Sequence, residues 1–158
     1  MNNYKIKNVN NLTIASLNIN SLRYKFDQLK VIIQDSIDIL IIQETKLDDT
    51  FPNGQFLLSG FLPPFRKDRN SHGGGVMVYI RENIPAKIIN CKHLPNDIEG
   101  IFVEMNFKNN KWLLFGTYHP PNQNSSYYFS EVGKVLDFYK AKYEKFILVG
   151  DFNKEDSN

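Results

Sequence analysis

An isoleucine-rich run, Ile37–Ile42, constrains the fold of this chain more than any other segment. Its shortness and its β-branched residues predict a strand that is buried on both faces. A further strand is predicted over Leu12–Asn18. Between the two strands the spacing of apolar residues predicts a helix, with Ser21 as its N-cap. One face of this helix carries Leu22, Phe26, Leu29 and Ile33. Because strand, helix and strand follow one another, we expect a layered α/β fold.

The rest of the chain continues in apolar strands and one more helix. Residues 45–70 are expected to form a loop with short extended pieces. A helix is predicted over about residues 126–142, with Phe129, Val132, Leu136 and Tyr139 on one face. Asn109 and Asn110 are predicted to form a hairpin turn, because Asn tolerates positive φ. The remaining strands are predicted over Gly75–Arg81, Ile98–Phe107, Lys111–Tyr118 and Phe146–Val149.

Composition limits the class of protein. A chain of 158 residues with 42% hydrophobic and 23% charged residues is long enough for one cored domain and too apolar for general disorder. We expect a polar arm over residues 1–11 and a domain over residues 12–158. No apolar run approaches the ~20 residues that cross a bilayer, so no membrane partner is expected. The single cysteine, Cys91, and the lack of a signal peptide favour a nuclear or cytoplasmic protein that is not secreted.

Four of the predicted strands end in polar residues. The strand from Leu12 ends at Asn18, and the isoleucine-rich run leads into Glu44. The strand from Lys111 ends at Tyr118, and the strand from Phe146 leads to Asp151 and Asn153. Ligands of layered α/β proteins collect outside the carboxyl ends of strands, so these residues could share one pocket. Carboxylate and amide oxygens suit Mg²⁺. Taken one at a time, each strand end is better explained as a solvated loop residue or a helix cap.

The motifs around these residues resemble those of the endonuclease/exonuclease/phosphatase superfamily, which has the fold of DNase I. They are Ser-Leu-Asn-Ile-Asn at Asn18, Ile-Gln-Glu-Thr-Lys at Glu44 and Val-Gly-Asp-Phe-Asn at Asp151. Gly-Gly-Gly-Val from Gly73 and Thr-Tyr-His-Pro-Pro around Tyr118 are similar to the apurinic/apyrimidinic-like endonuclease domain of non-LTR retrotransposon proteins. The resemblance implies an α/β fold, a two-sheet, four-layer α-β-β-α sandwich. It also implies Mg²⁺-dependent hydrolysis of phosphodiester bonds in DNA.

The resemblance also assigns roles to residues. Glu44 and Asp151 would bind Mg²⁺, with Mn²⁺ as an alternative. Asp151 would also act on the attacking water, while Asn153, Asn18 and Tyr118 would complete the catalytic set. The expected substrate-binding residues are Asn20, Asn122 and Arg69. The expected partner is DNA, and a reverse transcriptase domain would follow in the full-length protein.

The chain departs from the family pattern in two places. The family's last motif, Ser-Asp-His, is absent, so the fold is expected to be incomplete at its C-terminus. A second proline, Pro121, moves Asn122 one residue away from its usual place. Two alternatives therefore stay open. The chain could be a truncated, inactive remnant that at most binds metal or DNA, or a phosphatase or phosphodiesterase of the same superfamily.

Further residues near these motifs have two interpretations. Gly73–Gly75 precede a predicted strand and lack the Lys of a P-loop, so they predict a tight strand entry. Arg66, Lys67 and Arg69 form a small basic cluster that could contact a DNA backbone or lie in a solvated loop. His119, which follows Tyr118, could lie near the pocket as a catalytic residue, but a surface histidine is the favoured interpretation. Cys91 is expected to be a packing residue.

Overall fold

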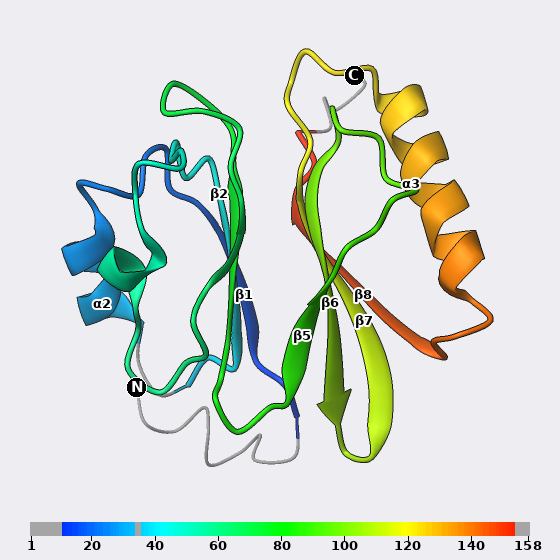
Figure 1. The fold of residues 1–158 in the computed structure, drawn as a ribbon, viewed down its shortest axis with the longest axis horizontal. Coiled ribbons are helices and arrows are strands. Elements are labelled where there is room, and N and C mark those ends of the chain that lie inside the picture. Colours follow the sequence, from blue (N-terminus) through cyan, green and yellow to red (C-terminus); the bar gives the residue numbers. More distant parts are fainter. Residues whose placement is uncertain (1–10, 34–35, 154–158) are drawn as a thin grey trace, which may run out of the picture.

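The computed structural model describes residues 11–33 and 36–153, and these residues form a sandwich of four layers. Two four-stranded sheets pack face to face, and one helix covers the outer face of each (Figure 1). The expected α-β-β-α sandwich is therefore confirmed. The predicted polar arm lies outside the described residues, apart from Asn11. Within the described residues, no helix is both long and apolar enough to cross a membrane.

The strand order is β1-β2-β4-β3 in the first sheet and β5-β6-β7-β8 in the second. The first sheet comprises β1 (Ile14–Asn18), β2 (Ile39–Gln43), β4 (Val76–Ile80) and β3 (Phe65–Lys67). The second comprises β5 (Ala86–Ile89), β6 (Glu99–Phe107), β7 (Asn110–Tyr118) and β8 (Lys145–Asp151). The helices are α2 (Phe26–Ile32), α3 (Ser125–Tyr139) and the short 3₁₀ helix η1 (Asn53–Phe56).

Each sheet contains one pair of parallel strands joined through a helix. In the first sheet β1 and β2 are parallel and α2 connects them, while in the second β7 and β8 are parallel and α3 connects them. Parallel neighbours end at the same edge of a sheet. The register places Asn18 beside Gln43 and Tyr118 beside Asp151. The polar strand ends predicted from the sequence therefore lie next to each other in each sheet, Asn18 with the Gln43-Glu44 end of β2 in the first and Tyr118 with Asp151 in the second.

Apolar side chains fill the space between the two sheets. All five residues of β2 are buried, as the isoleucine-rich run predicts. The side chains of this middle layer that are at most 3% exposed are those of Ile39, Ile41, Val76, Val78, Ile80, Ile101, Val103, Met105 and Leu114. Full burial of a side chain of this kind contributes about 1.5–3 kcal/mol, so this layer is a main source of the stability of the sandwich.

The first helix begins later than the sequence predicts. Helix α2 starts at Phe26 with Lys25 at the N-cap position, so the prediction of Ser21 as N-cap is wrong. Ser21 has φ of 83°, and its N–H donates to the Glu44 carbonyl at 2.8 Å. Leu22 pairs in the same way with Thr45 at 2.9 Å. Pairing with the segment after β2 thus prevents residues 21 and 22 from starting the helix.

Two local predictions in the second sheet also need correction. The hairpin turn is formed by Lys108 and Asn109, with φ of 50° and 60°, because Asn110 already pairs with Phe107. On α3, Val132 and Tyr139 are buried as predicted, but Phe129 is 46% exposed, and Tyr128 and Val135 complete the buried face. The helix starts at its N-cap Asn124, whose side chain accepts the N–H of Tyr127.

Strand β5 is not predicted from the sequence. None of its four residues is buried, so the segment lacks the apolar pattern by which the other strands are recognised.

Gly116 provides a test of how closely the sheets approach. A Cβ atom there would lie 2.8 Å from Cγ2 of Val78 and 3.4 Å from two atoms of Ile41 on the opposite sheet. We expect Gly116→Ala to lower the free energy of unfolding by about 1–3 kcal/mol, as overpacking of a core does. Gly133→Ala in α3 is the matched control, because its Cβ would meet no atom within 4 Å. There the free energy of unfolding should rise by about 0.5–1 kcal/mol. Urea unfolding measures both, and equal effects would contradict the prediction.

Candidate active site

Four polar side chains meet at the edge of the sandwich where β1, β2, β7 and β8 end. Asn18, Tyr118 and Asp151 are the last residues of β1, β7 and β8, and Glu44 directly follows β2. The Asn18 amide nitrogen donates to Glu44 Oε1 at 3.1 Å and to Asp151 Oδ2 at 3.0 Å. The Tyr118 hydroxyl donates to the same Glu44 oxygen at 2.7 Å. We call Asn18, Glu44, Tyr118 and Asp151 the carboxylate cluster.

Strand alternation explains why three of these side chains point between the sheets. Residues two apart on a strand share a face. Asn18, Tyr118 and Asp151 therefore follow the same side as Ile14, Leu114 and Val149, which belong to the middle apolar layer. Glu44 would point the other way if β2 continued. Its φ of 52° ends the strand and changes the direction of the chain, so that Glu44 can reach Tyr118.

The second sheet holds the loop that carries Glu44. Glu99, the first residue of β6, is 6% exposed, and its Oε2 accepts the N–H of Gly75 at 2.6 Å. The Gly75 carbonyl accepts the N–H of Thr45 at 3.3 Å. A Cβ on Gly75 would lie 2.4 Å from Thr45 Oγ1, and its φ is 91°, so the close approach requires glycine. The predicted strand entry at Gly73–Gly75 is thus also the contact that supports the Glu44 loop.

The hydrogen bonds of the cluster set the charge states of Glu44 and Tyr118. Burial by itself raises the pKa of Glu44, but hydrogen bonds from Tyr118 and Asn18 and the charge of Lys46 outweigh it and hold the pKa below its ordinary value. For Tyr118, burial and then the Glu44 carboxylate raise the pKa well above its usual range. Glu44 is therefore an ionised acceptor at neutral pH, and Tyr118 is a protonated donor.

Asn153 and Asn20 lie beside the carboxylate cluster, and their side chains bond to residues outside it. The Asn153 N–H donates to Asp151 Oδ1 at 3.1 Å, and its side-chain amide donates to the His119 carbonyl at 2.9 Å. The Asn20 side-chain oxygen accepts a hydrogen bond from Lys46 Nζ. Both residues thus support neighbours of Asp151 and Glu44 in this structure. Their predicted contacts with substrate stay predictions.

Asn122 and Arg69 lie in a separate cavity next to the cluster. This cavity has a volume of about 350 Å³ and is also lined by Glu99. Arg69 donates to Glu99 Oε1 at 2.7 Å, and its side chain is 44% exposed. The other two members of the predicted basic cluster are occupied: Arg66 bonds to Asp68 and to backbone carbonyls, and Lys67 is half-buried and bonds to the Ile98 carbonyl. Arg69, which also donates to the Gly73 carbonyl at 3.1 Å, is therefore the member whose side chain is substantially exposed.

The carboxylate cluster has the oxygen atoms that a hard divalent cation prefers. Mg²⁺ binds through one or two carboxylates and retains several waters. The carboxylates of Glu44 and Asp151 lie close enough to share one ion, since both accept from the same Asn18 nitrogen. Both are partly exposed, so a bound ion could retain water molecules. Among the described residues, no group of three or more His, Cys, Asp and Glu side chains could hold a metal ion. The fit therefore rests on two carboxylates and the neighbouring amide oxygens.

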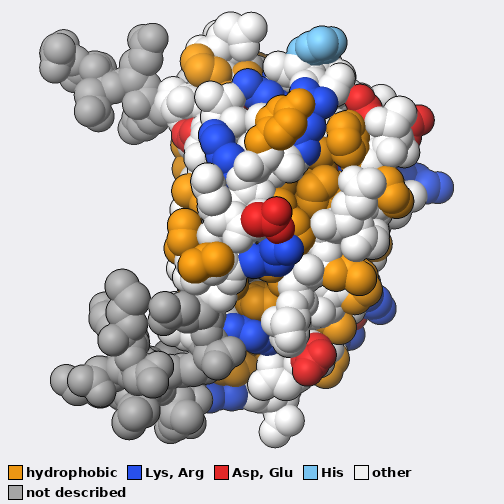
Figure 2. Space-filling view, turned by 90° about the vertical axis from the view of Figure 1, so that its left-hand side faces the viewer, with side chains coloured by type: hydrophobic (Ala, Val, Ile, Leu, Met, Phe, Trp, Pro, Cys, Tyr) orange, Lys and Arg blue, Asp and Glu red, His pale blue; other side chains and the backbone are white. Residues whose placement is uncertain are grey.

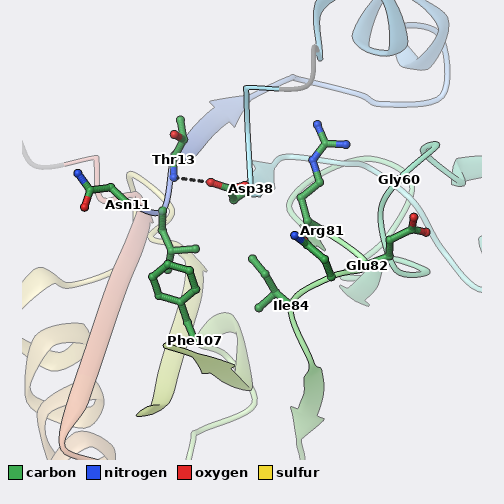
Figure 3. A pocket seen from close by; sticks show the side chains of 10 residues that line it. Asn11, Thr13, Asp38, Gly60, Arg81, Glu82, Ile84 and Phe107 are labelled. Atoms are coloured by element: carbon green, nitrogen blue, oxygen red, sulfur yellow. Dashed lines mark hydrogen bonds between the residues drawn. The ribbon is translucent and has the colours of Figure 1, made fainter. Parts of the chain in front are cut away.

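A second cavity, of about 490 Å³, lies at the opposite end of the sandwich (Figure 3). Thr13 and Asp38 line it just before β1 and β2 begin, and the Thr13 N–H donates to Asp38 Oδ2 at 2.8 Å. Arg81 lies over the Phe61 ring at 4.1 Å and donates to the Ile37 carbonyl. Asp38 and Arg81 hold loops at this end, and no second pair of bridged carboxylates occurs among the described residues that line the cavity.

The sequence match and the fold agree on the family. Residues 15–156 match the profile described as the Endonuclease/Exonuclease/phosphatase family, which is most of the chain. The chain belongs to this family. A search of curated proteins finds no match.

Solved structures of this family share the fold. The Neisseria 3′ phosphatase NExo bound to a product DNA hairpin is 20% identical with a TM-score of 0.63, covering 90% of this chain and 58% of that one. The endonuclease domain of TRAS1, a telomere-specific non-LTR retrotransposon, is 13% identical with a TM-score of 0.63, covering 93% and 61%. An AP endonuclease from Archaeoglobus fulgidus is 18% identical with a TM-score of 0.59, covering 90% and 58%. The chain thus spans less than two thirds of each. The family and these neighbours are hydrolytic nucleases and phosphatases.

Two residues support the site in ways that the sequence analysis did not predict. Glu99 had a usable signal: alternation places it on the same face of β6 as Ile101 and Val103, which face the other sheet. His119 is 1% exposed, so the expectation of a surface histidine is wrong. Its ring packs under Tyr128 of α3, a contact that depends on how the helix docks. Cys91 packs against the apolar layer below α3, as expected.

Tyr118→Phe tests the electrostatics of the cluster without requiring activity. Removing the hydroxyl takes a hydrogen bond from Glu44, so we expect the pKa of Glu44 to rise, as followed by the NMR pH titration of its side-chain carboxyl carbon. Because the folded-state pKa is lowered, ionised Glu44 stabilises the fold at neutral pH. This contribution disappears as the pH falls through that pKa. Tyr127→Phe, which loses a hydroxyl bonded to Asp97, is the control and should leave the pKa of Glu44 unchanged. A Glu44 titration unaltered by Tyr118→Phe would contradict the prediction.

Proposed function

We propose that this chain hydrolyses phosphodiester bonds in DNA with Mg²⁺, as the endonuclease domain of a retrotransposon-type protein. One observation carries the proposal. The carboxylates of Glu44 and Asp151, which come from different sheets, are bridged by the amide of Asn18 at the common carboxyl edge of four strands. Family membership supports hydrolysis of phosphate esters, and the similarity to the TRAS1 endonuclease domain supports the retrotransposon role.

Each member of the cluster has a chemical task in this proposal. A divalent cation held by Glu44 and Asp151 would neutralise charge on the phosphate. Asp151 accepts the proton of the attacking water or orients it. Tyr118, which stays protonated, donates to a phosphate oxygen and stabilises the charge that develops there. Asn18 and Asn153 donate to the phosphate or its neighbours once they leave their present acceptors. Mn²⁺ would serve in place of Mg²⁺, because it accepts the same oxygen ligands.

DNA binding is proposed to depend on local contacts. The formal net charge is only +2. On the face that carries α2, Lys and Arg side chains are interspersed with hydrophobic and uncharged ones (Figure 2). The exposed part of Arg69, held by Glu99 beside the cluster, is the contact we assign to a backbone phosphate. Asn122 in the same cavity and Asn20 beside Lys46 are the proposed neighbouring contacts. A reverse transcriptase domain in the full-length protein is part of the same proposal.

Two other functions remain as outcomes of the tests. A phosphatase or phosphodiesterase activity has a specific observation in its favour, the similarity to the Neisseria 3′ phosphatase. An inactive remnant that binds only metal or DNA would retain the cluster and show no turnover. Incubation with plasmid DNA, a 3′-phosphorylated oligonucleotide and an inositol phosphate separates the three.

Nicking of supercoiled plasmid is the direct test of the endonuclease. We expect Mg²⁺-dependent nicking that chelator removes. Glu44→Gln and Asp151→Asn should each lower the rate at least about 100-fold, because each variant removes a charge that the metal-bound phosphate needs. Asp137→Asn, on the exposed side of α3, is the matched control and should nick at the wild-type rate. Unchanged nicking in both cluster variants would contradict the proposed site.

The role of Arg69 is tested through the salt dependence of binding. A side chain that neutralises one phosphate contributes about 0.9 to the slope of log K against log salt concentration. We expect Arg69→Gln to lower that slope by about this amount for a duplex oligonucleotide in chelator, as measured by fluorescence anisotropy. Lys134→Gln on α3 is the control, since Lys134 pairs with Glu131 away from the cluster. An unchanged slope for Arg69→Gln would remove Arg69 from the DNA contact.

A further inference from the structure

His119 contacts three consecutive residues of the segment that carries Asp151. Its N–H donates to the Asp151 carbonyl at 2.8 Å, and its carbonyl accepts the Asn153 side-chain amide at 2.9 Å. Between these two bonds, its ring Nδ1 lies 2.7 Å from the Phe152 carbonyl. The backbone bonds would form with any residue except proline at position 119. The bond to Phe152 requires this side chain.

The bond to Phe152 identifies the protonated nitrogen of the ring. A carbonyl oxygen only accepts hydrogen bonds, so Nδ1 of His119 must carry the proton. In the neutral ring, Nε2 is then an unprotonated acceptor. This atom is buried, and it has no hydrogen-bond partner among the described residues. The bond therefore defines one tautomer of the ring, in which the Nδ1–H is committed to the Phe152 carbonyl.

Aromatic rings from α3 hold the imidazole in this orientation. The centroid of the His119 ring lies 4.6 Å from that of Tyr128 and 6.2 Å from that of Phe129. The Phe152 ring stacks on Phe129 at 6.1 Å. The Tyr128 hydroxyl is bonded in turn to Thr117, one residue before Tyr118. The ring thus has little freedom to turn away from the carbonyl that it holds.

The segment that His119 holds is a tight turn. Asn153 has φ of 39°, and its N–H donates to Asp151 Oδ1 at 3.1 Å. This bond and the amide of Asn18 together orient the Asp151 carboxylate. A change in the orientation of the Phe152 peptide would move Asn153 and break the hydrogen bond from its N–H to Asp151 Oδ1. The conformation of the turn, and hence the direction of the Asp151 carboxylate, therefore depends on the bond between the His119 ring and the Phe152 carbonyl.

We propose that His119 is a positioning residue that fixes the Asp151–Asn153 turn through its Nδ1–H, and so aligns Asp151 for hydrolysis. The kinetic part of this inference rests on the proposed function, while the structural part does not. His119 does not contact the substrate in this proposal. It differs from Tyr118 beside it, which donates directly into the cluster.

The tautomer is the first test, and it needs no activity. A long-range ¹H–¹⁵N correlation spectrum of the wild-type chain at pH 8 distinguishes the two neutral forms of the ring. We expect His119 as the Nδ1–H tautomer, and the side-chain amide signals of Asn153 should shift in His119→Leu. An Nε2–H tautomer would overturn the proposal whether or not the chain cleaves DNA. Absence of cleavage by a wild-type chain with the expected tautomer would contradict the proposed function and leave the structural inference standing.

The second test compares two substitutions at the same position. Asn carries an amide N–H close to the position of Nδ1, whereas Leu fills similar space without a donor. We expect His119→Leu to lower kcat about 10–100-fold with little change in KM, as loss of a supporting residue does. His119→Asn should recover most of that loss. His93→Leu, at an exposed histidine that stacks on Phe138, is the matched control. Equal losses in the Leu and Asn variants, at equal melting temperatures, would show a packing role and overturn the proposal.

Discussion

Face-to-face packing of the two sheets determines whether the carboxylate cluster exists at all. Asn18 and Glu44 belong to the first sheet, and Tyr118 and Asp151 belong to the second. The hydrogen bond between Asn18 and Asp151 joins residues 133 positions apart in the chain. No local preference can bring such groups together. The buried apolar layer between the sheets does so, because it fixes the distance and the register at which the two carboxyl edges face each other.

Hydrogen bonds at the edge of this apolar layer fix the positions of the site residues of the two sheets relative to one another. Bonds that cross from one sheet to the other include three close to the cluster, which are Asn18 to Asp151, Tyr118 to Glu44, and Gly75 to Glu99. Each joins a donor to a carboxylate, and such charge-assisted bonds are short and directional. In addition, His119 holds the turn after β8 from within the second sheet. The geometry of the site therefore depends on the separation of the sheets, and a change in the middle layer would reach all three crossing bonds.

Much of the fold follows from patterns that act over a few residues. The isoleucine-rich run does form a strand with every residue buried, and the strands predicted over Leu12–Asn18 and Lys111–Tyr118 are present as β1 and β7. The errors have non-local causes. Ser21 fails as a helix cap because its backbone pairs with Glu44, and Phe129 is exposed because α3 docks through Tyr128 and Val135. In both cases a tertiary contact decides the outcome, and for Ser21 it outweighs a capping preference of about 1 kcal/mol.

The sequence by itself determined which strands end in polar residues and on which face of its strand each of Asn18, Tyr118 and Asp151 lies, because alternation along a strand is a local property. Only the tertiary structure decided how these residues meet. It brought Glu44 back toward Tyr118 through a left-handed backbone conformation, paired Glu99 with Gly75, and buried His119 against α3. The physical reason is that these contacts join residues of different elements, whose relative placement depends on the packing of the sheets and helices as a whole.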